Sequence, residues 1–495
     1  MPLNWTFFSH KNSRTFLLWG WIAFLFSGVA FPPFLAGQAK LNILWINADD
    51  LGRELSCYGH PLVQTPNIDR LAEQGVRYTK AYANTPVCSP SRSSLITGFY
   101  PTSINCQDHR TLKMTELPDG IKPITEYFKN AGYFISNGSG LDMKKPGKRD
   151  YNFVPDIHYD GSDWSQRAKG QPFFAQVQIK YPHRSFVTST SHPIDPEEVV
   201  LPGCYLDHPL LKADWARYLE SVQACDSIVG RILNRLEGEG LADNTVVFFF
   251  GDHGRPHLRD KQFLYEGGLQ IPLIVRWPGQ LKPGKTDPRL VSLVDVAATT
   301  MRIADLEPDS PLHGKIFLGP EQEKREFVFG FRQRAGDAPD AIRSITDGRY
   351  KLIWNQEPQR PWMQLSSYKR SEYPAFTLYR ILHAKGELPP PYDQLMAPTR
   401  PEFELYDLKK DPEEFQNLAD NPRYTKHFES LQKTLLAKLK DYDQSVIIES
   451  AATIQQAKNG SARYLQKKMQ ERGLPSEISD QALLDYWYEL LLGGD

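Results

Sequence analysis

Cys88, Pro90 and Arg92 stand at alternate positions in one short stretch of the chain. No helix breaker follows until Gly98, which suits the position just past a helix end, so the stretch predicts a short helix that begins near Cys88. The free N–H groups and the positive dipole at a helix start favour an anion, and Arg92 lies one turn further on the same face. The residue types therefore indicate a reactive group in an oxyanion site, with a buried structural cysteine as the alternative.

Two acidic residues, Asp49 and Asp50, directly follow an apolar run at 41–48 that predicts a buried strand. The carboxyl ends of such strands are where open α/β sheets place their sites. Adjacent carboxylates repel each other unless positive charge lies near them, and Ca²⁺ and Mg²⁺ prefer carboxylate oxygen as a ligand. The pair therefore indicates a divalent-cation site, with a solvated loop as the alternative.

Predicted strands and helices alternate through the first 304 residues, which is typical of an α/β domain. The strands are expected at 41–48, 133–136, 171–179 and 245–250, and the helices at 65–75, 124–130, 215–236 and 291–304. Beyond these, the composition changes to short strands at 326–333, 341–346, 350–354 and 404–408 and a long helix at 424–442.

The composition is that of an ordinary globular protein, with 24% charged and 40% hydrophobic residues. A chain of 495 residues has room for two or three domains. The formal net charge is −1, so no overall basic field points to nucleic acid as a partner.

Residues 1–39 have the order of a signal peptide: basic Lys11 and Arg14, an apolar run at 16–34, and small residues before position 40. An uncleaved membrane anchor is the alternative. No later segment is apolar enough to span a bilayer, so we expect no stable membrane insertion after signal removal. The protein is therefore expected to be exported, either periplasmic or secreted.

Several segments together resemble the formylglycine-dependent sulfatases. They are the signature run at 86–98, the helix TPNIDRLAEQGVRY, the turn Tyr265-Glu266-Gly267-Gly268, and the C-terminal segments DGRYKLIWN and ELYDLKKDPEEFQNLAD. The resemblance extends over residues 41–445. It implies an alkaline-phosphatase-like α/β sandwich, with a large mixed central sheet flanked by helices and a smaller C-terminal antiparallel sheet. The implied domains are 40–325 (catalytic), 326–450 (antiparallel sheet with a packed helix) and 451–495 (a C-terminal extension).

The resemblance also implies the chemistry of the site. Cys88 would be oxidised to formylglycine by a formylglycine-generating enzyme or an anaerobic maturase, and the hydrated aldehyde would attack sulfur. The conversion would leave four cysteines, whose pairing the sequence leaves open. Ca²⁺ would be held by Asp49, Asp50, Asp252, His253 and the residue at position 88. The other implied catalytic residues are Arg92, Lys148 and Lys261, which would stabilise sulfate oxygens, and His183, which would protonate the leaving group.

One segment departs from the family pattern. Most sulfatases carry Gly-Lys-Trp-His after the strand near position 136, whereas here an insertion displaces a variant of that motif to Gly147-Lys148-Arg149-Asp150. We assign the family lysine to Lys148, with Lys144 and Lys145 as competitors. Asp150 stands where the family histidine would be, and it is the candidate for that histidine's role as a base.

Two further residues, His257 and Arg259, lie between site elements in the sequence. They would either contact the substrate or lie on the surface. The predicted function is hydrolysis of sulfate esters, or of sulfamates, in a sulfated carbohydrate. The alternatives are a phosphodiesterase or phosphonate monoester hydrolase on the same fold, or a non-catalytic binder of sulfated glycans.

Overall fold

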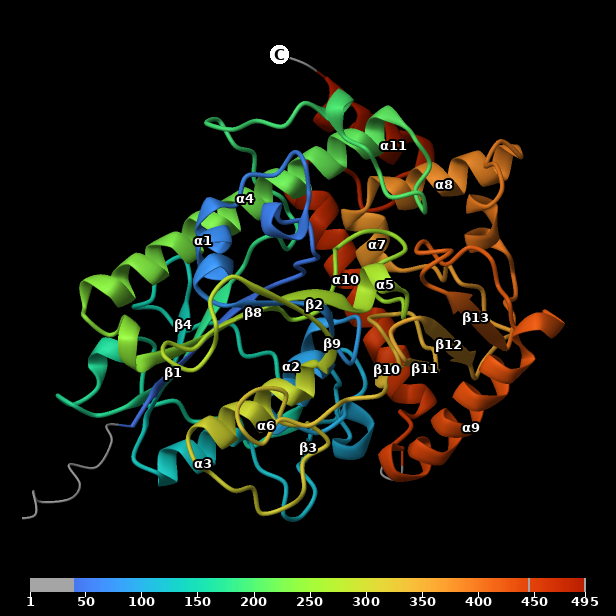
Figure 1. Cartoon of the computed structure of the whole chain (residues 1–495). Coiled ribbons are helices and arrows are strands. Elements are labelled where there is room, and N and C mark those ends of the chain that lie inside the picture. The colour runs from blue at the N-terminus through green and yellow to red at the C-terminus, as the bar shows by residue number, and fades with distance from the viewer. Residues whose placement is uncertain (1–39, 444–445, 494–495) are drawn as a thin grey trace, which may run out of the picture. The chain divides into compact units, whose positions relative to one another are not determined.

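A seven-stranded mixed sheet forms the centre of the computed structural model, which describes residues 40–443 and 446–493 (Figure 1). The predicted signal peptide, 1–39, lies outside the described residues. The strand order is β4-β6-β1-β7-β8-β2-β9; the first four strands run parallel, β8 is antiparallel to both its neighbours, and β9 is parallel to β2. The strands are β1 (Asn42–Ala48), β2 (Val76–Tyr82), β4 (Phe134–Ser139), β6 (Phe173–Ile179), β7 (Thr245–Gly251), β8 (Gln270–Arg276) and β9 (Lys285–Ser292).

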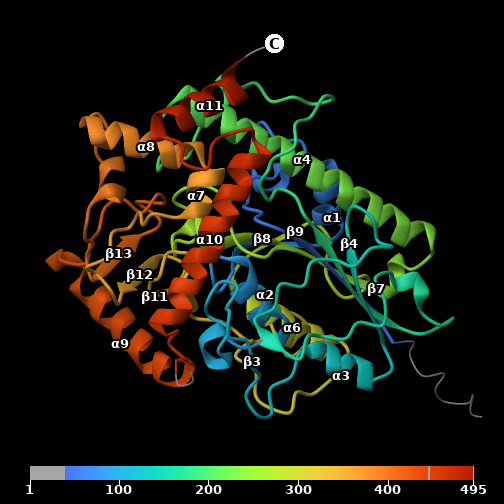
Figure 2. The same ribbon diagram turned by 180° about the vertical axis from the view of Figure 1, so that it is seen from behind.

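Side chains of β1 alternate between the two faces of the sheet. Leu44 and Ile46 belong to one buried apolar cluster, and Ile43 and Trp45 belong to another on the opposite face. Helices cover both faces (Figures 1 and 2), which explains why the strand is a continuous apolar run in the sequence. The helices are α1 (Pro66–Gln74) and α4 (Pro209–Gly238) on one face, and α2 (Cys88–Thr97), α3 (Ile124–Asn130) and α6 (Leu293–Ile303) on the other. Shorter elements are α5 (Glu266–Leu269) and the paired strands β3 (Thr115–Glu116) and β5 (Phe153–Val154).

A four-stranded antiparallel sheet, in the order β10-β11-β12-β13, forms the smaller C-terminal part. One face packs on α9 through Leu431, Leu435 and Leu439. The other face packs on Phe263 and Tyr265, which lie between β7 and β8 in the chain. The elements predicted for this region are confirmed as β10 (Val328–Arg332), β11 (Ile342–Thr346), β12 (Tyr350–Asn355), β13 (Phe403–Asp407) and α9 (Thr425–Tyr442).

Four further helices are absent from the sequence-based expectations: α7 (Ser367–Glu372), α8 (Pro374–Lys385), α10 (Ala451–Glu471) and α11 (Asp480–Leu492). The last two contain most of the C-terminal extension. α10 packs against α7, and α11 packs against α8 and α4, as both views show. Met469, Leu483 and Trp487 join the same apolar cluster as α4, so the extension is packed onto the helices that cover the large sheet.

The expected fold class is confirmed, because the large mixed sheet lies between helices and the small sheet is antiparallel. Within the described residues, no helix is both long enough and apolar enough to cross a membrane. All five cysteines lie in the described part of the chain, and none of them forms a disulfide.

Candidate active site

Three carboxylates meet where β1 and β7 end. The two strands are paired in parallel with Ala48 opposite Gly251, so the residues that follow them emerge side by side. Carboxylate oxygens of Asp49, Asp50 and Asp252 all lie within 4.8 Å of one another. The backbone N–H of Asp50, which has a left-handed φ of 64°, donates to Asp252 Oδ1 at 3.0 Å. The register of two buried strands therefore builds the predicted acidic cluster.

Cys88 is the first residue of α2 and lies directly beside this cluster. Its Sγ is 3.3 Å from His253 Nε2 and 3.9 Å from Asp50 Oδ1. Its side chain is almost completely buried. The helix ends before Gly98, whose φ of 75° is left-handed, so the predicted helix with Cys88 at its start is confirmed.

Arg92, on α2, connects this helix to the residues that directly follow β1 and β7. Its Nε donates to Asp252 Oδ2 and its Nη2 donates to Asp49 Oδ1, both at 3.0 Å. Its Nη1 donates to Gln178 Oε1 on β6 at 2.6 Å. The guanidinium is buried, and its three bonds fix its plane against Asp49 and Asp252 of the acidic cluster.

The insertion after β4 folds back and returns the chain to the sheet. Gly138 and Pro146 form an isolated antiparallel bridge, and the N–H of Gly147 donates to the carbonyl of Asn137 at 2.9 Å. Lys148, the next residue, reaches Asp49 with Nζ 2.9 Å from each carboxylate oxygen. The other two candidate lysines, 144 and 145, are exposed on the insertion.

Replacement of Lys148 by alanine is therefore expected to reduce turnover by about 10²-fold, because one cation that faces the site is lost. Lys148→Arg should restore little, since a planar guanidinium does not replace a compact ammonium in a fitted pocket. Lys144→Ala and Lys145→Ala are the matched controls and should have wild-type kinetics. Steady-state rates on one sulfated substrate test this, and an essential lysine at 144 or 145 with a dispensable Lys148 would contradict it.

Lys261 and His183 face the second aspartate. The Nζ of Lys261 is 2.8 Å from each oxygen of Asp50. His183 Nε2 is 3.8 Å from Asp50 Oδ2. The side chain of Lys261 is only 4% exposed, whereas that of His183 is 22% exposed. His183 therefore lies nearer the open side of the site.

The charges of this cluster account for its unusual acidities. Burial opposes ionisation of Asp49 and Asp50, but the surrounding lysines, Arg92 and histidines hold the pKa of both carboxyls well below the ordinary value. Burial raises the pKa of Asp252 above its ordinary value, and Asp49 adds to that rise. Burial also opposes the charge of His253, yet Asp252, Cys88 and Asp50 raise its pKa to about 10.

This donor set fits a hard divalent cation. Three buried carboxylates within 4.8 Å of one another attract positive charge strongly, and carboxylate oxygens are the ligands that Ca²⁺ and Mg²⁺ prefer. His253 is less typical of such sites, because imidazole suits softer metals. The residues present can therefore hold the metal that the family resemblance implies.

His109 is a site residue that the sequence interpretation missed. One ring nitrogen of His109, the Sγ of Cys88 and a carboxylate oxygen of Asp150 all lie within 4.8 Å of one another. Nε2 of His109 is buried and has no hydrogen-bond partner among the described residues. The next residue, Arg110, donates its backbone N–H to Ser89 Oγ at 2.8 Å, which ties this loop to the signature helix. His109 belongs to no motif identified in the sequence and does not follow a predicted strand, so the sequence gives no signal for it.

Asp150 also lies beside Cys88, but it is paired. Its carboxylate accepts from Arg110 at 3.2 and 3.3 Å and lies 3.5 Å from Lys148 Nζ. Burial opposes its ionisation, yet Lys148 and Arg110 lower the pKa of Asp150 below its ordinary value. Burial and Arg110 lower the pKa of His109 well below its ordinary value. His109 is therefore a neutral imidazole at neutral pH. Its Nε2 has no partner among the described residues, whereas the carboxylate of Asp150 is held by two cations, so His109 is the less constrained of the two groups beside Cys88.

His109→Ala is accordingly expected to reduce turnover by about 10²–10⁴-fold, the usual contribution of a proton-transferring side chain. His192→Ala is the control, since His192 is exposed on a surface loop. Rates measured for both variants, together with Asp150→Asn, separate the two candidates. If Asp150→Asn abolishes activity and His109→Ala does not, the assignment is reversed.

The structure buries both His257 and Arg259, so neither is a surface residue. The ring of His257 stacks on Trp215 with centroids 4.1 Å apart. The guanidinium of Arg259 donates to the backbone carbonyls of Glu413 and Glu414 at 2.7 and 2.6 Å. Neither residue is among the side chains gathered around the acidic cluster, and each has a structural partner.

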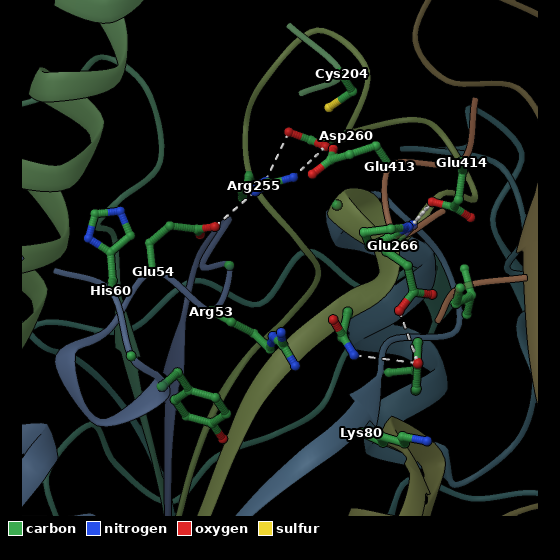
Figure 3. A pocket seen from close by; sticks show the side chains of 18 of the residues that line it. Arg53, Glu54, His60, Lys80, Cys204, Arg255, Asp260, Glu266, Glu413 and Glu414 are labelled. Carbon is green, nitrogen blue, oxygen red and sulfur yellow. Dashed lines mark hydrogen bonds and ion pairs between the residues drawn. The ribbon is translucent and has the colours of Figure 1, made fainter. Parts of the chain in front are cut away.

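A cavity of about 750 Å³ is lined by residues of the loop that follows Asp50 and of the loop that precedes Lys261, and Cys88 is not among its lining residues (Figure 3). The side chain of Arg255 lies in the wall of this cavity. Its Nη1 is 2.9 Å from Glu54 Oε1 and its Nε is 3.0 Å from Asp260 Oδ2. Glu54 follows Asp50 by four residues, and Asp260 directly precedes Lys261. Arg255 therefore ties together the two loops that carry Asp50 and Lys261.

Comparisons with known proteins agree with this geometry. Residues 41–306 match the sulfatase family, and residues 251–374 match the family described as N-sulphoglucosamine sulphohydrolase, C-terminal. An ulvan-active sulfatase of Formosa agariphila is 30% identical over 474 residues, which cover 85% of this chain and 78% of that protein. Human N-acetylgalactosamine-6-sulfatase is 28% identical over 353 residues, which cover 57% of this chain and 64% of that protein.

Solved structures share the fold at lower identity. A protein in complex with its substrate D-glucosamine-2-N,6-O-disulfate has a TM-score of 0.59 at 20% identity, covering 81% of this chain and 98% of that one. Phosphonate monoester hydrolase of Agrobacterium radiobacter has a TM-score of 0.60 at 19% identity, covering 81% and 96%. With the family matched over more than half of its length, the chain belongs to the sulfatases, and it is a sulfuric ester hydrolase of the alkaline-phosphatase-like fold.

Proposed function

We propose that the protein removes sulfate from a sulfated carbohydrate, using a formylglycine formed from Cys88 and a bound Ca²⁺. The observation that carries this proposal is the convergence of three buried carboxylates and three cationic side chains beside Cys88. The relatives support the substrate class, because an ulvan-active sulfatase and N-acetylgalactosamine-6-sulfatase are among the proteins that this chain resembles.

The position of Cys88 suits a nucleophile. Formylglycine at this position would supply a hydrated aldehyde, and one of its hydroxyls would be the group that attacks sulfur. The N-terminus of α2 favours negative charge beside that atom, and α2 begins at Cys88 itself. The residues of the signature helix therefore both present the reacting group and favour the anion that it attacks.

The cations orient the sulfate group. Each of the three cations contacts a carboxylate of the cluster: Arg92 and Lys148 contact Asp49, and Lys261 contacts Asp50. These contacts fix the positive charges beside the atoms that react. Fixed donors of this kind stabilise charge that moves onto oxygen during the reaction, without reorganisation. They hold the three non-bridging oxygens while the S–O bond to the sugar breaks.

Two histidines on different sides of the site would transfer protons, one as a donor and the other as an acceptor. His183, on the more open side, donates a proton to the leaving oxygen of the sugar. His109, whose Nε2 has no partner among the described residues, would accept the proton of the second hydroxyl at residue 88, and loss of that proton would expel sulfate and re-form the aldehyde. Its neutral ring takes the place of the histidine that most sulfatases carry at the position of Asp150.

The metal would be held by Asp49, Asp50, Asp252 and His253, together with residue 88. A divalent cation there supplies positive charge toward the sulfate and the attacking oxygen. The carboxylates also hold Arg92 and the two lysines in place through the contacts described above.

We further propose that the protein is exported and acts in the periplasm or outside the cell. This rests on the order of basic, apolar and small residues in 1–39. Cell fractionation of the natural host, with protein sequencing of the mature N-terminus, tests it.

The substrate class is tested by incubating protein from a host with a formylglycine-generating enzyme with a panel of defined sulfated saccharides. Release of sulfate from at least one saccharide is expected. An aryl phosphodiester and an aryl phosphonate monoester are assayed in parallel, since phosphonate monoester hydrolases share the fold. Faster turnover of either phosphorus ester than of every sulfate ester would contradict the proposal, and saccharide binding without turnover would indicate a non-catalytic binder.

A further inference from the structure

The loop that carries His109 is held from two sides. On the side of α2, the backbone N–H of Arg110 donates to Ser89 Oγ at 2.8 Å. Arg110 has a left-handed φ of 51°, a conformation that a residue other than glycine keeps only where its surroundings hold it. On the other side, the loop is held by residues from the C-terminal part of the chain.

Arg334, which lies just beyond the end of β10, holds the backbone of His109 at two points. The N–H of His109 donates to the carbonyl of Arg334 at 2.9 Å, and Nη1 of Arg334 donates to the carbonyl of His109 at 3.2 Å. The N–H of Arg334 also donates to Oδ1 of the preceding residue, Asp108, at 3.0 Å. These contacts connect the C-terminal sheet directly to a loop of the active site.

Glu449 fixes the guanidinium of Arg334 in turn. Its carboxylate accepts from Nε and Nη2 of Arg334, from the latter at 2.9 Å, and it also accepts from Thr111 Oγ1 at 3.3 Å. The side chains of Arg334 and Glu449 are only 4% and 8% exposed. A bidentate pair has a defined geometry, so Arg334 and Glu449 form a rigid clamp on the loop.

The clamp holds the backbone of a side chain that lies beside Cys88. One ring nitrogen of His109 is within 4.8 Å of Cys88 Sγ. Nε2 of the ring is buried and has no hydrogen-bond partner among the described residues. Because Nε2 has no such partner, the position of the ring depends on the backbone of His109, which Arg334 holds.

We propose that Arg334 is a positioning residue for His109, and that Glu449 fixes Arg334 for that task. This rests on the proposed function, in which His109 accepts a proton at residue 88. A reacting group that is misplaced by about 1 Å can lose about 10²-fold in rate, so the clamp affects turnover more than substrate binding. The C-terminal sheet therefore contributes to catalysis as well as to stability.

Two conservative variants test the clamp. Arg334→Ala would leave the buried carboxylate of Glu449 without its partner and endanger folding, so Arg334→Lys and Glu449→Gln are used. Each should lower kcat on a sulfated saccharide by about tenfold or more and leave KM within about twofold of wild type, because the loop shifts while the cations around the sulfate stay in place. Arg400→Lys is the matched control and should keep the wild-type kcat, since Arg400 is equally buried and pairs with Asp340 in the same part of the chain.

A double-mutant cycle separates positioning from a general structural effect. In a His109→Ala background, Arg334→Lys should change kcat by less than about twofold, because the side chain that it positions is absent. An equal loss of kcat with and without the His109 ring would overturn the proposal.

Hydrogen exchange gives a readout that depends neither on catalysis nor on conversion of Cys88. The backbone N–H of His109 donates to Arg334, so peptides that contain residues 106–112 should exchange faster in Arg334→Lys and Glu449→Gln, and at the wild-type rate in Arg400→Lys. Unchanged exchange in the first two variants would overturn the clamp. If exchange rises in them but His109→Ala keeps wild-type turnover, the proposed function loses its proton acceptor and the clamp on the loop stands.

Discussion

The Cys88→Ala variant is expected to fold normally and to lose turnover by a factor on the order of 10⁶, as loss of a nucleophile does in other hydrolases. The side chain is buried at the start of α2, 3.3 Å from His253 and 3.9 Å from Asp50. Removal of one sulfur atom leaves the helix and its contacts in place. The thermal midpoint should therefore change by only about one degree, which corresponds to about 1 kcal/mol in a chain of this size.

Cys225→Ala is the matched control for this prediction. Cys225 is also fully buried, but it packs in the apolar cluster around α4. Its replacement should destabilise the protein by a similar amount and leave turnover unchanged. Rates and thermal midpoints of both variants separate catalysis from folding.

The same residue can be examined by mass spectrometry of the peptide that contains position 88. Protein from a host with the converting enzyme should carry formylglycine there, with the mass change expected for loss of the thiol and gain of an aldehyde. Protein from a host without it should carry cysteine and be inactive. Full activity of protein with an unmodified thiol at 88 would refute the nucleophile assignment.

The central part of the site could be predicted because its residues follow regular elements. Asp49 and Asp252 come directly after buried strands, and Cys88 begins a helix with a legible end at Gly98. An apolar run of β-branched and aromatic residues gives a strand from local pattern alone. Parallel pairing of two such strands then brings their carboxyl ends together.

His109 could not be predicted, because what positions it is not local. Its neighbour in the loop, Arg110, is held by Ser89. The loop of His109 is also held by contacts with residues such as Arg334, which is more than 200 positions away. His109 has no periodic pattern around it, so only the tertiary structure shows that it borders the site.

The C-terminal extension shows the same limit. Ser450 and Ser479 cap α10 and α11 by accepting backbone N–H groups, which is a signal for helix starts. Yet α10 has few buried apolar residues, with Ala457 and Met469 the buried ones among those described. A weak apolar stripe does not indicate where a helix packs, so its place against α7 was not foreseen.

Removal of the divalent cation is the other change with a very large expected effect. A chelator should abolish turnover, and Ca²⁺ added in excess should restore it, because the three carboxylates of the cluster are close together and buried. Stability should respond as well: a ligand that binds only the folded state raises the unfolding free energy, by about 2.7 kcal/mol at a concentration one hundred times its Kd. The thermal midpoint should therefore rise with Ca²⁺ in the chelated protein.

Asp252→Asn tests the ligand set at a single position. The amide keeps the size of the side chain but removes a charge that also holds Arg92 at 3.0 Å. Turnover should fall by about 10²–10³-fold or more, the loss usual for one strong charge-stabilising group, and the rise of the thermal midpoint with Ca²⁺ should be largely lost. Asp309→Asn is the control, since the exposed side chain of Asp309 pairs with exposed Lys122 at the surface. Full activity in metal-free protein, or an unchanged response of Asp252→Asn to Ca²⁺, would show that the acidic cluster does not bind the metal. Because the rise of the thermal midpoint reports Ca²⁺ binding without turnover, this outcome does not depend on how completely Cys88 has been converted.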